Sequence, residues 1–242
     1  MNNIKIIPLM IALILMTAPV RAGEINDPFE SYNRVIFKVN DSLDRALLEP
    51  LARGYRSVVP NGLRTAIHNI LVNLKSPLTN GNQLLQGDLT GAGKATVRTV
   101  VNSLVGVGGI FDVAAMEGIE DEPEDFGQTL AVWGVGQGPY IVPPILPGAG
   151  LRDHIGYMAD MYADPLRLWL HNTDEDGWMI TRTAVDIVDK RSRLIDVIED
   201  LRRNSIDQYA TMRSAYAQNR AALINDQGGK EAVIPNYARG EE

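Results

Sequence analysis

An uncharged stretch of 26 residues lies between Asp125 and Arg152, and it contains six glycines and four prolines. Its sequence is FGQTLAVWGVGQGPYIVPPILPGAGL. A stretch of this length could reach across the hydrocarbon of a bilayer, but its prolines remove backbone donors and clash with the preceding helical turn. Irregular backbone is not tolerated against lipid unless protein or a wet cavity satisfies its polar groups. We therefore expect the segment to line something, or to be buried by the rest of the chain, and not to form a membrane-spanning helix.

The first 22 residues have the pattern of a signal peptide. Lys5 gives a basic start, and Ile6–Met16 is an apolar run that only Pro8 breaks. Small residues then indicate cleavage between Ala22 and Gly23. The alternative is a short membrane anchor, although the apolar run is shorter than the roughly 20 residues that a span needs. We expect one domain over residues 23–227 and a disordered tail over residues 228–242.

The composition excludes several classes of function. The chain has a net charge of −7 and no basic stripe, which argues against nucleic-acid binding. It has no cysteine, so disulfides, thiol nucleophiles and thiolate metal sites are excluded. Its histidines, His68, His154 and His171, have no metal-ligand spacing, and no serine lies in a nucleophile-elbow motif. We therefore expect no metal, no cofactor and no enzymatic activity, and we interpret Arg152 and Asp153 as an ion pair or helix start.

Apolar residues recur at steps of three and four along most of the chain, which predicts six to eight amphipathic helices and very little strand. The fold class is therefore all-α, with one extended or hairpin segment near residues 136–150. Asp27, Pro28 and Glu30 match a capping box at the first helix, and Ser205 with Gln208 matches another. Pro50 and Pro77 are expected to interrupt helices. We expect these helices over about 27–49, 61–76, 90–104, 125–134, 151–163, 181–203 and 205–224, together with short helices over about 77–86 and 111–116.

Periodicity alone leaves two interpretations of these helices open. The stripes are typical of a soluble helical core, and helices that lie in a membrane interface carry the same pattern. Trp169 and Trp178 are interpreted as core residues, although tryptophan also favours membrane interfaces. The acidic run Glu117–Asp125 is interpreted as a solvated loop, with a docking patch for a basic partner as the alternative.

Five separated sequence blocks, which occur in order, carry a resemblance to a known family. The chain resembles the MlaA/VacJ family of outer-membrane proteins from about Asp27 to Asp164, with a weaker similarity to about Ile224. The residues that match its motifs include Asp27, Pro28, Asn33, Arg34, Phe37, Asn40, Asp41, Asn73, Leu74, Gly87, Asp88, Arg98, Asn102, Gly106, Asp112, Phe126, Gly127, Gln128, Arg152 and Asp153.

The resemblance implies a function and partners. Members of that family are ring-shaped helical proteins in the inner leaflet of the outer membrane, bound to trimeric porins. They remove mislocalised phospholipids from the outer leaflet and pass them to a soluble periplasmic carrier, which maintains lipid asymmetry. The resemblance therefore places this chain at the periplasmic face of the outer membrane. Family members are acylated on a cysteine after the signal peptide, and this sequence has none, so we expect that the chain is not a lipoprotein.

The segment 136–150 is our candidate for the lining or moving part of a lipid channel. Gly134, Gly136 and Gly138 permit backbone angles that other residues avoid, and the prolines beyond them stiffen the arm. A rigid buried loop is the alternative. The candidate channel or gate residues are Gly134, Gly136, Gly138, Pro139, Tyr140, Ile141, Val142, Pro143, Ile145 and Leu146. Two other functions stay open, a soluble periplasmic lipid-binding helical protein and a structural or adhesion protein.

Overall fold

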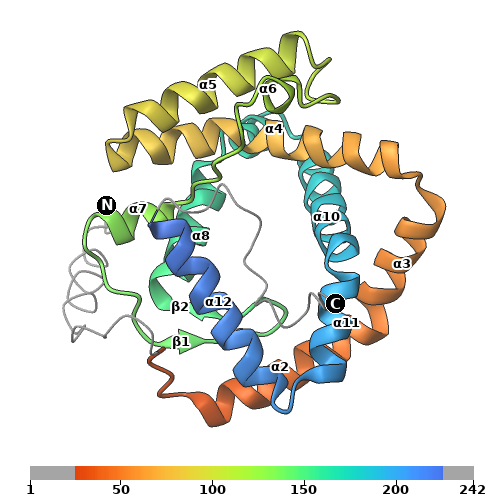
Figure 1. Cartoon of the computed structure of the whole chain (residues 1–242), viewed down its shortest axis with the longest axis vertical. Coiled ribbons are helices and arrows are strands. Elements are labelled where there is room, and N and C mark those ends of the chain that lie inside the picture. The colour runs from red at the N-terminus through yellow and green to blue at the C-terminus, as the bar shows by residue number, and fades with distance from the viewer. Residues whose placement is uncertain (1–24, 226–242) are drawn as a thin grey trace, which may run out of the picture.

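The structure is a computed structural model that describes residues 25–225, and its helices follow one another around a ring (Figure 1). The signal peptide, its cleavage site at Ala22 and Gly23, and the tail over 228–242 lie outside these residues. The ring is mostly helical, with one short antiparallel hairpin, which confirms the expected fold class. The first half comprises α2 (Glu30–Leu43), the π-helical turn η1 (Asp44–Leu48), α3 (Glu49–Val58), α4 (Asn61–Gln86), α5 (Leu89–Leu104) and α6 (Val113–Met116).

The second half of the chain completes the ring. Its elements are α7 (Phe126–Val132), β1 (Tyr140–Ile141), β2 (Ala149–Gly150), α8 (Leu151–Ala163), α9 (Pro165–Asn172), α10 (Asp176–Arg193), α11 (Ile195–Asn204) and α12 (Gln208–Ile224). Figure 1 shows α5 on the outer side of α4, with α10 and α11 on the inner side of α3. Helix α12 runs back from the end of α11 towards α7 and so connects the side of the ring that holds α11 with the side that holds α7.

Pro50 does not interrupt the first helical segment as expected. The chain stays helical through the π-turn Asp44–Leu48, and Pro50 occupies the first turn of α3. A π-turn bonds residue i to i+5, and here the backbone N–H of Glu49 donates to the carbonyl of Asp44. The first turn of a helix tolerates proline because its N–H groups have no intrahelical partner. The elements α2, η1 and α3 therefore form one continuous amphipathic segment, without the expected break at Pro50.

Two other helix boundaries differ from the expectation. Residues 61–76 and 77–86 form the single helix α4, with Pro77 inside it. Packing on α5 holds both halves together, since Asn73 bonds Ser103 on one side of the proline and Asn80 bonds the carbonyl of Ala92 on the other. The expected helix 181–203 begins earlier, at Asp176, and breaks at Leu194 into α10 and α11.

The two predicted capping boxes are wrong. Helix α2 starts at Glu30 with no side-chain cap, because the Asp27 carboxylate accepts from the side chains of Asn33 and Arg213 and not from the first backbone N–H groups of the helix. Helix α12 is capped by Asp207, whose side chain accepts a hydrogen bond from the N–H of Ala210. Tertiary partners and a neighbouring aspartate therefore replace the local caps that the sequence offered.

The distribution of polar and apolar side chains is inverted relative to an ordinary globular protein. The largest fully buried side chains of the described residues are all polar: Gln128, Asn33, Thr129, Asp189 and Ser192. Many large apolar side chains are exposed on almost every helix, and Trp169 and Trp178 are 60% and 65% exposed. The interpretation of these two tryptophans as core residues is therefore wrong. Extended exposed apolar surface marks an interaction with protein or membrane.

Candidate functional site

The segment 136–150 forms an arm that turns back at its tip. Tyr140 pairs with Gly150 and Ile141 with Ala149 in antiparallel register, so β1 and β2 make the base of a hairpin. We call Gly134–Gly150 the arm and Pro143–Pro147 its tip. Among the predicted hinge glycines, Gly134 and Gly138 have positive φ angles of 87° and 69°, whereas Gly136 does not adopt the left-handed conformation. The left-handed region strongly favours glycine, so two of the three glycines are required by the backbone.

Two asparagines of α2 hold the arm by its backbone. Asn33 is fully buried, donates to the carbonyl of Tyr140 at 2.9 Å and accepts from the N–H of Val142 at 2.9 Å. Asn40 donates to the carbonyls of Pro143 and Leu146 at 2.9 and 3.1 Å. Because seven residues make about two helical turns, both asparagines lie on one face of α2. The spacing of these two residues in α2 therefore sets the register of the arm.

The tip of the arm contains an unfavourable backbone conformation. Ile145 has a φ of 71°, which is a genuine outlier for a β-branched residue. Its N–H donates to Oδ1 of Asn40 at 2.8 Å. Strained residues of this kind persist only when the surrounding structure determines them, and they cluster at functional sites.

The predicted lining residues of the arm divide into two groups. Tyr140 and Val142 are only 4% and 2% exposed and belong to an aromatic core with Tyr209, against which Phe37 and Tyr216 pack. Burial raises the pKa of Tyr140 to about 12. Ile141, Pro139 and Pro143 are half-buried. Ile145 is 82% exposed, and Leu146 is also exposed, so the apolar surface that the arm offers lies at its tip.

Helix α12 contacts the N-terminal half of α2 and the residue Asp27 before it. Tyr209 and Arg213 both donate to the Asp27 carboxylate, and Arg34 forms a bidentate ion pair with Asp207 at 2.7 and 3.0 Å. Arg213 lies on the same face of α12 as Tyr209 and Tyr216, and its role was not predicted. The alternation of tyrosine and arginine at steps of three and four was the available signal.

The C-terminal half of α12 holds the start of α7, the end of the arm and the start of α8. Arg220 bonds both oxygens of Asp125 at 2.6 and 2.7 Å, and it bonds Asp153 at 3.0 Å. Tyr216 donates to Asp153 and accepts from the N–H of Gly150 at 2.8 Å. The ion pair expected between Arg152 and Asp153 is present at 2.8 Å, at the start of α8.

The block Phe126-Gly127-Gln128 allows α7 to cross α8 at backbone distance. A Cβ at Gly127 would lie 2.4 Å from the Arg220 guanidinium, and one at Gly156 would lie 2.3 Å from the Gly127 nitrogen. The N–H of Phe126 donates to Asp160 at 2.9 Å, and buried Gln128 donates to the carbonyl of Pro123 at 3.1 Å. These residues therefore hold the helix pair that carries the arm.

Charged side chains converge on the inner side of α2 and α3. Arg191 forms a bidentate ion pair with Asp44 at 2.7 and 2.8 Å, and Arg202 bonds Asp41, Asp44 and Glu49. The adjacent motif residues Asn40 and Asp41 thus have different partners, since Asn40 holds the arm and Asp41 holds α11. This network was not predicted, because its members are distant in sequence.

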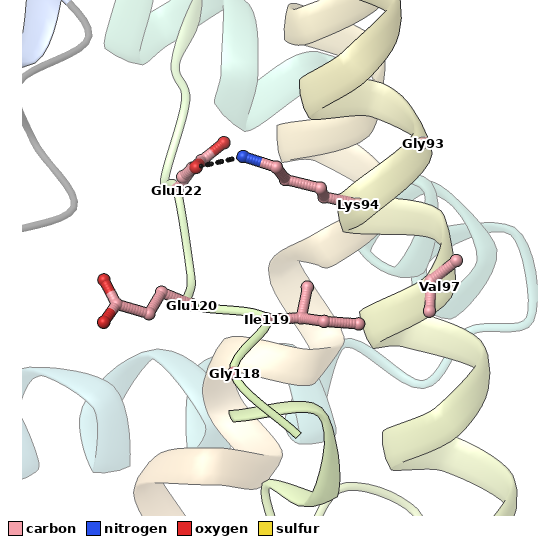
Figure 2. Close-up of a pocket in the computed structure, with 7 residues that line it drawn as sticks. All are labelled: Gly93, Lys94, Val97, Gly118, Ile119, Glu120 and Glu122. Carbon is pink, nitrogen blue, oxygen red and sulfur yellow. Dashed lines mark hydrogen bonds and ion pairs between the residues drawn. The ribbon is translucent and has the colours of Figure 1, made fainter. Parts of the chain in front are cut away.

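The acidic run before α7 is not simply solvated. Lys94 on α5 forms an ion pair with Glu122 at 2.8 Å, which Figure 2 shows beside a pocket of about 410 Å³. Arg98 pairs with Asp112 at 2.9 Å and lies 3.5 Å from Asp121, and Asp125 caps α7. The pocket lies between α5 and this loop and includes no residue of the arm.

In residues 25–225 no group of histidines and carboxylates could hold a metal ion, and no helix is long and apolar enough to cross a membrane.

Comparisons with known proteins agree in sequence and in fold. A family model described as "MlaA lipoprotein" matches residues 25–223. The chain is 36% identical to an uncharacterized protein of Rickettsia bellii, covering 83% of this chain and 78% of that one. It is 33% identical to the intermembrane phospholipid transport system lipoprotein MlaA of Escherichia coli, covering 87% and 83%, and equally similar to the protein of that name in Haemophilus influenzae, covering 85% and 82%.

A solved structure has the same fold. It comes from work on the structural basis for maintenance of bacterial outer membrane lipid asymmetry, and it superposes with a TM-score of 0.72 at 35% identity, covering 83% of this chain and all of the other. The relatives from Escherichia coli and Haemophilus influenzae are both named lipoproteins. The expectation that this chain is not a lipoprotein therefore finds no support among them.

Proposed function

The chain belongs to the MlaA family, and we propose from this premise that it removes mislocalised phospholipids from the outer leaflet of the outer membrane. In this proposal the ring lies in the inner leaflet, at the periplasmic face of the membrane. It passes each phospholipid to a soluble periplasmic carrier and is held beside a trimeric porin. The process involves no covalent chemistry.

One observation supports this proposal above the others, namely the inversion of polar and apolar surface. Apolar side chains of α2, such as Val35, Val39 and Leu43, are exposed, while many of the buried side chains are polar or charged. Exposed apolar helix faces are matched to acyl chains, and polar side chains that cannot lie against lipid are kept within the ring. A soluble periplasmic lipid-binding protein, the competing interpretation, would be expected to bury these side chains instead.

The energetic problem explains why such a device is needed. Burial of each methylene contributes about 0.8 kcal/mol, so exposing two acyl chains of about 15 methylenes each to water costs on the order of 20 kcal/mol. The headgroup has the opposite difficulty in hydrocarbon. A polar route for the head beside apolar surface for the tails lowers both costs.

We further propose that the arm gates this route. The support is that its tip is apolar, exposed and strained at Ile145, and that Asn40 of α2 holds this tip through hydrogen bonds. A rearrangement of the tip would change how much apolar surface lies beside the proposed polar route for the headgroup. The glycine positions Gly134 and Gly138, where the backbone is left-handed, are the candidate hinges.

Fractionation of the untagged protein tests the proposal. Membranes would be washed with high salt, and the lipids and proteins that co-purify would be identified by mass spectrometry. We expect the protein to stay with outer membranes together with phospholipid and a porin. Complete recovery in the soluble periplasm would favour the lipid-binding alternative and overturn the proposed location.

A further inference from the structure

Two lysines share a single carboxylate oxygen between α4 and α10. Lys75 on α4 donates to Oδ2 of Asp186 at 2.7 Å, and Lys190 on α10 donates to the same oxygen at 3.0 Å. Two ammonium groups therefore face one carboxylate, which leaves one positive charge uncompensated. The next carboxylate along α10, Asp189, is fully buried and pairs with Arg193, so it does not supply the missing charge.

The lysine pair is accessible and lies between α4 and α10. The side chains of Lys75 and Lys190 are 37% and 56% exposed, whereas Asp186 is largely covered. Helix α4 uses another face, with Asn73 and Asn80, to pack on α5, which lies outside it (Figure 1). Lys75 reaches α10 instead, and Figure 1 shows α10 on the inner side of α3.

Comparison with Lys94 shows what an ordinary pair looks like in this protein. Lys94 faces Glu122 one to one at 2.8 Å (Figure 2), and the Glu122 carboxylate raises its pKa. Burial and the charge of Lys190 instead lower the pKa of Lys75 to about 8. This happens although the Lys75 ammonium lies only 2.7 Å from the Asp186 carboxylate. The Asp186 carboxylate contributes to a raised pKa of Lys190, so this one carboxylate serves two ammonium groups, and an added anion would favour the charged form of both.

We infer that Lys75 and Lys190 bind the phosphate group of a phospholipid between α4 and α10. The inference rests on the proposed function, because it takes the lipid as the source of the phosphate. Lysine ammonium groups bind phosphate as point charges, and each offers three donors, of which Asp186 takes one. The exposed ammonium groups can thus bond phosphate oxygens while Asp186 keeps them together.

Calorimetry on the full chain in non-ionic detergent tests this inference. The probes are dihexanoyl phosphatidylglycerol below its micelle concentration, inorganic phosphate, and dihexanoylglycerol, which has tails but no phosphate. Lys75→Gln keeps the Asp186–Lys190 pair and removes the excess charge, and we expect it to weaken phosphatidylglycerol binding about tenfold. Asp186→Asn raises the excess charge and should strengthen binding several-fold. Lys75→Arg should bind like wild type, and so should the control Lys94→Gln.

The outcomes separate this inference from the proposed function. If wild type binds phosphatidylglycerol and Lys75→Gln binds it equally well, the site is wrong and the function stands. If wild type does not bind phosphatidylglycerol at all, the proposed function fails as well. Weaker binding by Asp186→Asn, with an unchanged circular dichroism spectrum, would indicate a structural ion pair and contradict the site. Inorganic phosphate that binds as tightly as the lipid would overturn the lipid as the source.

Discussion

Asn40 and Ile145 are joined by a 2.8 Å hydrogen bond from the Ile145 N–H to the Asn40 side chain, which holds the isoleucine at a φ of 71°. The same amide donates to two carbonyls of the tip, at Pro143 and Leu146. One side chain of α2 therefore maintains a conformation that the arm would not adopt by itself.

Replacement of Asn40 by alanine should release the tip without unfolding the ring. The variant loses three hydrogen bonds, each contributing about 1 kcal/mol or less at this partly exposed site, and the relief of strain offsets part of that loss. We expect faster proteolysis of residues 143–147 and a higher outer-leaflet phospholipid level in cells. Ser42→Ala, which removes only a bond within α2, is the control. Equal proteolysis in both variants would contradict the role of Asn40.

Deletion of one residue within Ile36–Asp41 should disturb lipid gating more than folding. The deletion turns the rest of α2 by about 100° relative to Asn33. Asn33 and Asn40 could then no longer hold the arm together. The measurement is outer-leaflet phospholipid at matched protein abundance, with Asn40→Ala as the comparison that keeps the register. An unchanged phospholipid level in the deletion strain would exclude the arm as a gate.

Cross-linking of the tip to α2 should block lipid transfer reversibly. Val39 and Leu146 are both exposed, and Leu146 lies beside Asn40, so cysteines at these two positions are within reach of a cleavable thiol cross-linker. The chain has no cysteine of its own. We expect transfer of phospholipid to stop on cross-linking and to return on cleavage, with each single-cysteine variant as control. Transfer at the wild-type rate by the cross-linked protein would mean that the arm is only structural.

Replacement of Arg220 by alanine should destabilise the ring by about 3 kcal/mol, because it leaves the buried Asp153 and its neighbour Asp125 short of a partner. The exposed pair Arg203–Glu199 provides the control, since Arg203→Ala should cost less than about 1 kcal/mol.

Burial raises the pKa of Asp125, but the Arg220 guanidinium outweighs it and holds that pKa below its usual value. The contribution of this pair is therefore complete above the unfolded pKa of about 4 and is lost as pH falls further. Chemical denaturation at neutral and acidic pH measures both effects.

An aspartate in place of the exposed Trp169 should reduce membrane association. A charged group in the interface loses the favourable burial of the indole and adds a cost of desolvation. The bound fraction after a high-salt wash is the readout. Thr173→Asp, which adds the same charge one turn later on a polar position, is the control. If both variants stay bound like wild type, Trp169 does not face the membrane.

The sequence allowed the helical class, the arm and several boundaries to be predicted, because these depend on local signals. Helix α8 has the predicted bounds, and α7 begins at Phe126, one residue after the expected start. The continuation through Pro50 and Pro77 depends on tertiary packing and on a π-turn, which no local pattern encodes. Trp169 was misassigned because burial and membrane exposure give the same periodicity.

In the candidate site, too, some features could be predicted from the sequence and others could not. Asn33 and Asn40 were singled out by resemblance, and their hydrogen bonds to the arm explain why these positions need a side-chain amide. The carboxylate networks of Arg202 and Arg220, by contrast, join residues that only the closed ring brings together. Whether the arm moves stays a prediction, because its anchoring alone fits a rigid loop as well.

The contacts of α12 also determine when this protein can fold. Arg213 and Asp27 are 186 residues apart, and Arg34 and Asp207 are 173 apart. These two ion pairs therefore cannot form until nearly all of the described chain has been synthesised. Contacts of such high sequence separation form slowly, and the incompletely folded chain is open to chaperones and proteases in the meantime.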